Sequence, residues 1–276
     1  MNILTQYFDT LHNTAPFSQI KNEDYLPAFA EAIAQTRQEI DLIAQHSETA
    51  TFDNTIAAMA FSGLQLERIS ALFFNLHAAE TSPEFDSIAQ EIAPQLSALS
   101  NDITLNFALF ERIKSIYEQR EQLSLTTEQQ TLLSKNYKDF VRNGALLADE
   151  DKEKLRAIDA ELSTLKLSYG ENLLADSNAY QLHITDEKDL AGLPDAVIEA
   201  AQATAKSADK DGWIFTLDYP SFVPFTTYAD NRELRKEIAL AAGRKAYQDN
   251  DNNNEALVLK IVNLRHQRAK LLGYPT

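Results

Sequence analysis

The sequence predicts a mainly α-helical fold, built of long antiparallel helices with a small two-stranded β insertion at about residues 180–218. Apolar residues recur every three or four positions over most of the chain, which is the spacing that places them on one face of a helix. Two short segments instead alternate apolar and polar residues, as strands do. The predicted helices are long and their connections are short and polar, which favours antiparallel packing of neighbours.

Six helices are predicted before the β insertion. The third begins at Pro83 with Ser82 as its N-cap, and the fifth follows a capping box of Thr126 and Gln129 and ends at Gly144. The sixth opens with "DEDKEK", whose acidic residues are favourable at a helix N-terminus. The predicted helices cover about 22–45, 54–76, a third from 83 onward, then about 107–122, 127–143 and 149–176.

The β insertion is predicted from "AYQLHIT" and "GWIFTLD". Their alternating apolar residues are Tyr180, Leu182 and Ile184 in the first segment and Trp213, Phe215 and Leu217 in the second. A helix is predicted between the two strands, over 193–208. Two more helices are predicted over 231–247 and 255–272, on either side of the polar run 249–254.

The segment "DYPSFVPFTTYAD", residues 218–230, has an aromatic side chain at every third position. These side chains are Tyr219, Phe222, Phe225 and Tyr228. We favour a short helix or turn that docks into the core, because large aromatic side chains dominate core packing. The alternative is an aromatic lining for an extended ligand.

Composition and charge exclude several classes of function. With 44% hydrophobic and 24% charged residues, the 276-residue chain has the composition of a soluble globular protein. Its net charge of −16 argues against nucleic acid and anionic membrane surfaces as partners. The chain has no cysteine, which excludes disulfides and thiolate nucleophiles. No secretory leader and no apolar run of the ~20 residues that span a membrane are recognised, so we expect a cytoplasmic protein.

No motif for a reaction centre is recognised. The seven glycines are never neighbours, which argues against dinucleotide-binding, phosphate-binding and nucleophile-elbow motifs. The histidines are too far apart in the sequence to form a helical zinc-binding pair; they are His12, His46, His77, His183 and His266. We therefore assign no catalytic residue and no metal ligand to this chain, and the substrate-binding residues are unassigned.

The segment "DNDNNNE", residues 249–255, resembles the start of a calcium-binding loop. Asp249, Asp251 and Asn253 occupy the first, third and fifth positions. However, the glycine required at the sixth position is Asn254, and the glutamate required at the twelfth is Lys260. We expect a solvated loop that caps the following helix.

Seven segments, in their order and spacing, resemble the amino-terminal half of the thimet oligopeptidase family of zinc metallopeptidases. They are "FSQIKNEDYLPAF" (17–29), "TFDNTIAAM" (51–59), "RISALFFNLHAAET" (68–81), "NDITLNFALFERI" (101–113), "ENLLAD" (171–176), "DLAGLPDAVI" (189–198) and "IVNLRHQRAKLLGYP" (261–275). The "FFNL", "NDITLN" and "FVRNGALL" segments look closest to bacterial peptidyl-dipeptidases (Dcp-like), and oligopeptidase A is a near relative. The resemblance covers nearly the whole chain.

The resemblance implies that residues 1–276 are the helical, amino-terminal region of a longer clam-shell peptidase. The catalytic half is expected after residue 276, with a His-Glu-x-x-His helix, a further glutamate ligand and a zinc ion that polarises the attacking water. The present chain would form one wall of a narrow channel that admits short peptides and excludes folded proteins. No catalytic or metal residue is carried over, so we expect this chain to be inactive alone. Release of carboxyl-terminal dipeptides and internal cleavage are both left open.

Two other functions are compatible with the same residues. One is a stand-alone helical protein-interaction module that has lost the peptidase half. The other is an enzyme that acts through scattered carboxylates. The coding sequence beyond Thr276 distinguishes the module from the peptidase, and a metal or activity assay of the chain tests the enzyme.

Overall fold

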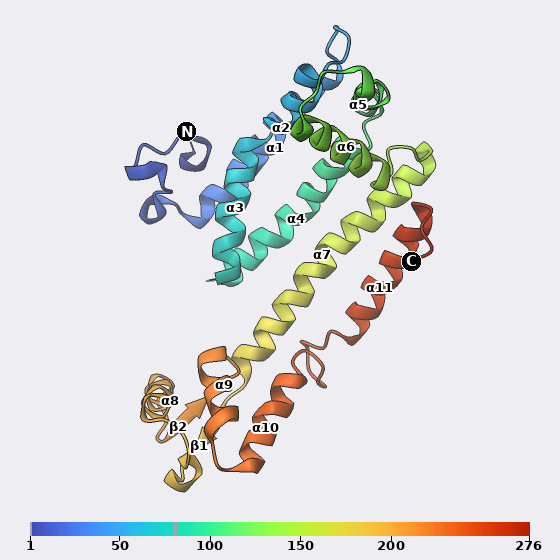
Figure 1. Ribbon diagram of the computed structural model, residues 1–276. Coiled ribbons are helices and arrows are strands. Elements are labelled where there is room, and N and C mark those ends of the chain that lie inside the picture. The colour runs from blue at the N-terminus through green and yellow to red at the C-terminus, as the bar shows by residue number, and fades with distance from the viewer. Residues whose placement is uncertain (1, 80–81) are drawn as a thin grey trace. The chain divides into compact units, whose positions relative to one another are not determined.

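The computed structural model describes residues 2–79 and 82–276, and it is mainly helical, as predicted (Figure 1). The chain divides into two compact units: unit 1 comprises the residues up to Leu167 together with Val262–Thr276, and unit 2 comprises Ser168–Ile261. The helices and strands are η1 (Ile3–Thr5), η2 (Leu11–Asn13), η3 (Phe17–Gln19), α1 (Asn22–Ala44), η4 (Phe52–Ala57), α2 (Ala58–Ala60), α3 (Leu64–Ala79), α4 (Pro83–Thr104), α5 (Phe107–Glu118), η5 (Arg120–Gln122), α6 (Thr127–Arg142), α7 (Asp149–Ala179), β1 (Leu182–Ile184), η6 (Glu187–Leu190), α8 (Asp195–Ser207), β2 (Trp213–Phe215), α9 (Tyr219–Tyr228), α10 (Arg232–Gly243) and α11 (Glu255–Leu271).

The first core of unit 1 lies among α1, α3 and α4. In Figure 1 the chain runs up α1, down α3 and up α4, which is the antiparallel packing that the sequence predicts. Phe73 of α3 is fully buried, and its ring centroid lies 5.0 Å from that of Tyr25 and 5.6 Å from that of Phe29, both on α1. Phe85 of α4 stacks on Phe73 at 5.3 Å. One aromatic cluster therefore joins the three helices.

A second core of unit 1 lies among α1, η4, α5 and α6. Phe110 of α5 stacks between Tyr137 and Phe140 of α6, with centroid distances of 5.9 and 6.3 Å. Arg112 of α5 secures the connection between α1 and η4, because its guanidinium donates to the carbonyl oxygens of His46 and Glu48 and to Oδ1 of Asn54.

The predicted helix over 54–76 is wrong as a single element. The structure has η4 and α2 over Phe52–Ala60, a turn at 61–63, and then α3 from Leu64. Gly63 has φ +71°, and its amide donates to Oε2 of Glu39 at 2.7 Å. A left-handed residue cannot continue an α-helix, so the chain turns at Gly63 although the apolar spacing continues across it.

One segment of the described chain, Phe52–Ala79, is long and apolar enough to cross a membrane by length and composition alone. This corrects the expectation that no segment approaches that composition. The segment is interrupted at the Gly63 turn, and its Ile69 and Phe73 are fully buried in the first core. These two residues of the segment belong to the packed core of unit 1.

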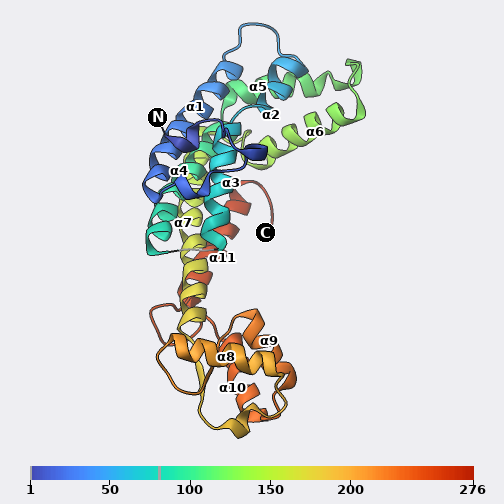
Figure 2. The same cartoon turned by 90° about the vertical axis from the view of Figure 1, so that its left-hand side faces the viewer.

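Unit 2 contains the predicted β insertion. β1 and β2 pair antiparallel, with Leu182 opposite Phe215 and Ile184 opposite Trp213. Figure 2 shows α8, α9 and α10 close together in this unit, and the contacts of α8 and α9 with β2 place the helices against the hairpin. The buried residues of the strands and helices form one core, which is centred on Phe215 and Phe225.

The aromatic segment 218–230 forms α9, which confirms the short docked helix. Phe225 is fully buried, and its ring centroid lies 4.5 Å from that of Phe215. Tyr219 and Tyr228 are 78% and 53% exposed. Residues three apart drift around a helix, so the four aromatic side chains are divided between core and solvent.

Two predicted helix ends are displaced. α5 ends at Glu118, and residues 120–122 form a separate 3₁₀ turn, η5. α10 ends at Gly243, four residues before the predicted end at 247. Ala246 has φ +53° and its amide donates to Asp176 of α7, so a side chain distant in the sequence determines the backbone there.

Candidate functional site

The described residues, 2–79 and 82–276, contain no group of three or more histidine, aspartate or glutamate side chains that fits a metal ion. Three histidine rings contact polar groups nearby: His46 Nδ1 accepts from the amide of Glu48 at 3.2 Å, His77 Nε2 lies 3.0 Å from Asp86 Oδ1, and His183 Nε2 lies 2.6 Å from the Asp211 carbonyl oxygen. The residues present therefore do not fit a zinc site, and no catalytic step is assigned to them.

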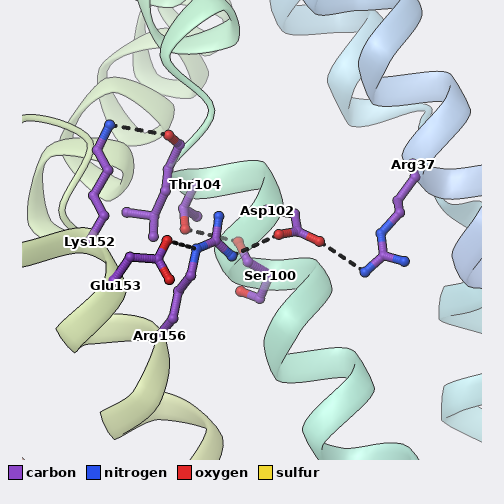
Figure 3. Close-up of polar contacts among 8 residues, drawn as sticks. Arg37, Ser100, Asp102, Thr104, Lys152, Glu153 and Arg156 are labelled. Carbon is purple, nitrogen blue, oxygen red and sulfur yellow. Dashed lines mark hydrogen bonds and ion pairs between the residues drawn. The ribbon is translucent and has the colours of Figure 1, made fainter. Parts of the chain in front are cut away.

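The clearest polar constellation in unit 1 is centred on Asp102 of α4. Figure 3 shows this carboxylate between two arginines from other helices: Arg37 Nη2 of α1 lies 2.9 Å from Oδ2, and Arg156 Nη1 of α7 lies 2.7 Å from Oδ1. Arg156 also reaches Glu153 on its own helix, with 3.7 Å between Nε and Oε1. One carboxylate therefore joins three helices.

Lys152 lies beside this bridge and is almost buried, with 9% of its surface exposed. Its ammonium donates to the carbonyl oxygen of Leu105, the C-cap residue that follows α4, at 3.4 Å. A cation at a helix C-terminus stabilises the unpaired carbonyl groups there. The "DEDKEK" segment is the start of α7, as predicted, and three of its four acidic residues lie in the first turn of that helix. Lys152 has the additional role of attaching that turn to α4.

We predict that Asp102→Asn lowers the free energy of unfolding by about 1 kcal/mol, because both arginines lose their ionic partner while each pair is partly exposed. The matched control is Glu153→Gln, whose side chain is 77% exposed and which we expect to change stability by less than about 0.5 kcal/mol. Urea unfolding measures both. Equal effects of the two variants would show that Asp102 is an ordinary surface charge.

A cavity of about 550 Å³ lies among α4, α7 and α11 in unit 1. On one side, Arg268 of α11 donates from Nε to Asp159 Oδ1 of α7 at 2.6 Å and from Nη2 to Asn143 Oδ1 at 3.1 Å. Lys166, Arg265 and the amide of Asn101 also line the cavity. Its walls therefore carry three cationic side chains, two amides and one carboxylate, that of Asp159, together with hydroxyl and apolar side chains.

Unit 2 contains a buried polar cluster around Asp176, which is 5% exposed. Its carboxylate accepts hydrogen bonds from the amide of Ala246 at 2.7 Å, from Asn250 Nδ2 at 2.7 Å and from Gln248 Nε2 at 3.0 Å. Burial raises the pKa of Asp176, but these hydrogen bonds together lower that pKa below its ordinary value. The side chain is therefore ionised at neutral pH.

The same cluster explains the segment 249–255. Asn253 Oδ1 accepts from the amide of Glu255 at 2.9 Å, which confirms the cap of the following helix. The loop is less solvated than predicted, because Asn254 is 4% exposed; it donates to the carbonyl oxygen of Tyr169 and accepts from Asn172. Asn250 and Asn254, which are not the residues that match a calcium loop, attach this loop to α7.

We predict that Asp176→Asn lowers the free energy of unfolding by about 2 kcal/mol at pH 7, because three donors lose a charged acceptor. The pKa of Asp176 is lower in the folded chain than in the unfolded chain. The stabilisation by the ionised carboxylate is therefore fully present above the pKa of the unfolded chain, and it is lost as the pH falls through the pKa of the folded chain. The difference between the two chains should therefore begin to shrink only below the ordinary pKa of 3.8 and should be smallest below the lower pKa of the folded chain. Asp251→Asn, an exposed change of the same charge in the same loop, is the control for urea unfolding at several pH values. A difference that persists at low pH would contradict the assignment.

Comparisons with known proteins show that the chain is homologous to peptidases. No protein-family model matches it. It is 35% identical over 260 residues to a dipeptidyl carboxypeptidase of Salmonella typhimurium and 34% identical over 268 residues to a dipeptidyl carboxypeptidase of Escherichia coli. It is also 30% identical over 269 residues to oligopeptidase A of S. typhimurium.

These matches cover 94–96% of this chain but only 38–40% of the length of the relatives. The chain therefore corresponds to an amino-terminal part of the dipeptidyl carboxypeptidase and oligopeptidase A proteins, which confirms the resemblance stated from the sequence. Sequence reasoning missed the roles of Asp102, Lys152 and Asp176. Asp102 lies in the "NDITLN" segment and Asp176 ends "ENLLAD". Two of the three residues therefore belong to the segments on which the family resemblance rests, and this was the only feature of the sequence that could have drawn attention to them.

Proposed function

We propose that this chain is the helical, non-catalytic part of a zinc metallopeptidase that hydrolyses short peptides. The observation that carries the proposal is the similarity to dipeptidyl carboxypeptidases and oligopeptidase A over nearly the whole chain, together with the small share of those relatives that it spans. In this proposal the zinc ion and its ligands belong to polypeptide beyond residue 276, and residues 1–276 form one wall of a channel that selects substrates by size.

Two features of the chain support a scaffolding role. The most extensive polar constellation in unit 1, centred on Asp102, uses its charges to hold three helices together. In the cavity among α4, α7 and α11, the carboxylate of Asp159 is paired with Arg268, so this charge also joins two helices. A cytoplasmic location is part of the proposal; it agrees with the lack of cysteine and with a 27% identical relative named probable cytosolic oligopeptidase A of Arabidopsis thaliana.

The coding sequence downstream of Thr276 tests the proposal. We expect it to continue in frame and to encode a His-Glu-x-x-His motif, and the longer product should cleave short peptides in a zinc-dependent way. Mass spectrometry of the products then separates release of carboxyl-terminal dipeptides from internal cleavage. A natural stop codon directly after Thr276 would favour the helical interaction module and would remove the peptidase from this gene.

A further inference from the structure

The charge of α11 is opposite to that of the chain. The chain as a whole carries −16, yet the residues after Glu255 include four cations and no carboxylate: Lys260, Arg265, Arg268 and Lys270. Arg268 is paired with Asp159. Arg265 and Lys270 are exposed and have no ionic partner among the described residues. A local positive potential on an acidic protein attracts anions to that place.

Three cationic side chains, two on α11 and one on α7, line the cavity of about 550 Å³ in unit 1. Lys166 of α7 and Arg265 and Arg268 of α11 line it, with Asp159 as the acidic residue. The lining therefore carries three positive charges against one negative charge, and only Arg268 is compensated. Lys166, like Arg265, has no hydrogen bond or ion pair to any residue that the structure describes.

A second, independent observation concerns Asn101 of α4. The residue is 5% exposed and lines the same cavity, but its side-chain amide forms no hydrogen bond within the described chain. The amide is not one of the fully buried side-chain groups without a partner, so it is open to solvent at the cavity wall. Its position at the cavity wall makes the amide available to a ligand.

The donors define the chemistry of that ligand. They are side chains from α4, α7 and α11, and none of these lining residues lies in the first turn of its helix, where free backbone N–H groups would favour a phosphate. Arginine and lysine bind carboxylates and phosphates alike, so the choice between these two anions depends on the spacing of the donors. A cavity of this size, with donors on separate helices, is matched by an extended ligand with several anionic groups.

We propose that this cavity binds a small organic anion with two or more carboxylate groups, through Arg265, Lys166 and the amide of Asn101. The proposal does not depend on the peptidase function. The probe is citrate, titrated calorimetrically into the 276-residue chain at low ionic strength. We expect saturable binding with one site per chain, and weaker binding of acetate and inorganic phosphate.

Arg265→Gln should weaken citrate binding about tenfold or more, because it removes a charge-assisted contact. Lys270→Gln is the matched control, since it removes the same charge from the same helix outside the cavity lining, and it should change the affinity by less than about twofold. Arg265 is exposed, so both variants should keep the thermal unfolding of the parent chain.

Three results would overturn the proposal. Citrate that does not saturate the chain by about 10 mM would show that there is no site. Equal losses in the Arg265 and Lys270 variants would reduce the binding to general electrostatic attraction. If phosphate bound as tightly as citrate, the cavity would hold one small anion, and several carboxylate groups would not be needed for binding.

Discussion

Phe73→Ala is expected to lower the free energy of unfolding of unit 1 by about 3–5 kcal/mol. Phe73 is fully buried, and its ring contacts aromatic rings from α1 and α4. Truncation removes the transfer free energy of the ring and leaves a cavity where three helices meet, and the surrounding helices can relax only in part.

Hydrogen exchange measured by mass spectrometry can assign the effect of Phe73→Ala to its location. Protection should fall in the peptides of α1, α3 and α4, which share the cluster. The control is Phe61→Ala, because Phe61 is 75% exposed and its loss should change stability by less than about 0.5 kcal/mol. Similar exchange in the two variants would mean that these helices do not share a core.

Phe225→Ala is the corresponding change in unit 2, and we expect it to cost about 3–5 kcal/mol. Phe225 is fully buried against Phe215 of β2. Trp213, the single tryptophan of the chain, lies on β2, so its fluorescence during urea unfolding reports on this unit. The variant should shift the tryptophan transition to lower urea concentration.

Tyr219→Ala provides the control on the same helix, because Tyr219 is 78% exposed. We expect it to leave the tryptophan transition within about 0.5 kcal/mol of the parent. If instead Tyr219 proved as important to stability as Phe225, the division of the aromatic row between core and solvent would be wrong.

The helices could be predicted where the sequence contains local signals. The capping box at Thr126 and Gln129 forms as expected, with Thr126 N donating to Gln129 Oε1 at 3.0 Å, and Ser82 caps α4. The turn at Gly63 could not be predicted by apolar spacing, because isoleucines and leucines keep the helical period on both sides of it. A lone glycine within such a pattern is compatible with a helix as well as with a break.

The polar contacts around Asp102 and Asp176 could not be predicted from the sequence, for a different reason. Arg37 and Asp102 are 65 residues apart, and Asp176 and Ala246 are 70 apart, so the contacts depend on tertiary packing. Periodicity shows that such charged side chains lie off the apolar face, but it does not show which charge meets which. The same limit applies to the cavity lining, where Asn101 and Arg265 come from the two separate chain segments that make up unit 1.

The central claim is that these helices support a peptidase whose metal centre lies in other polypeptide. The direct measurement is the zinc content of the purified 276-residue chain after dialysis, together with its action on a series of short peptides. The account predicts no stoichiometric zinc and no shortened peptide. About one zinc ion held per chain, or cleavage by the chain alone, would contradict it.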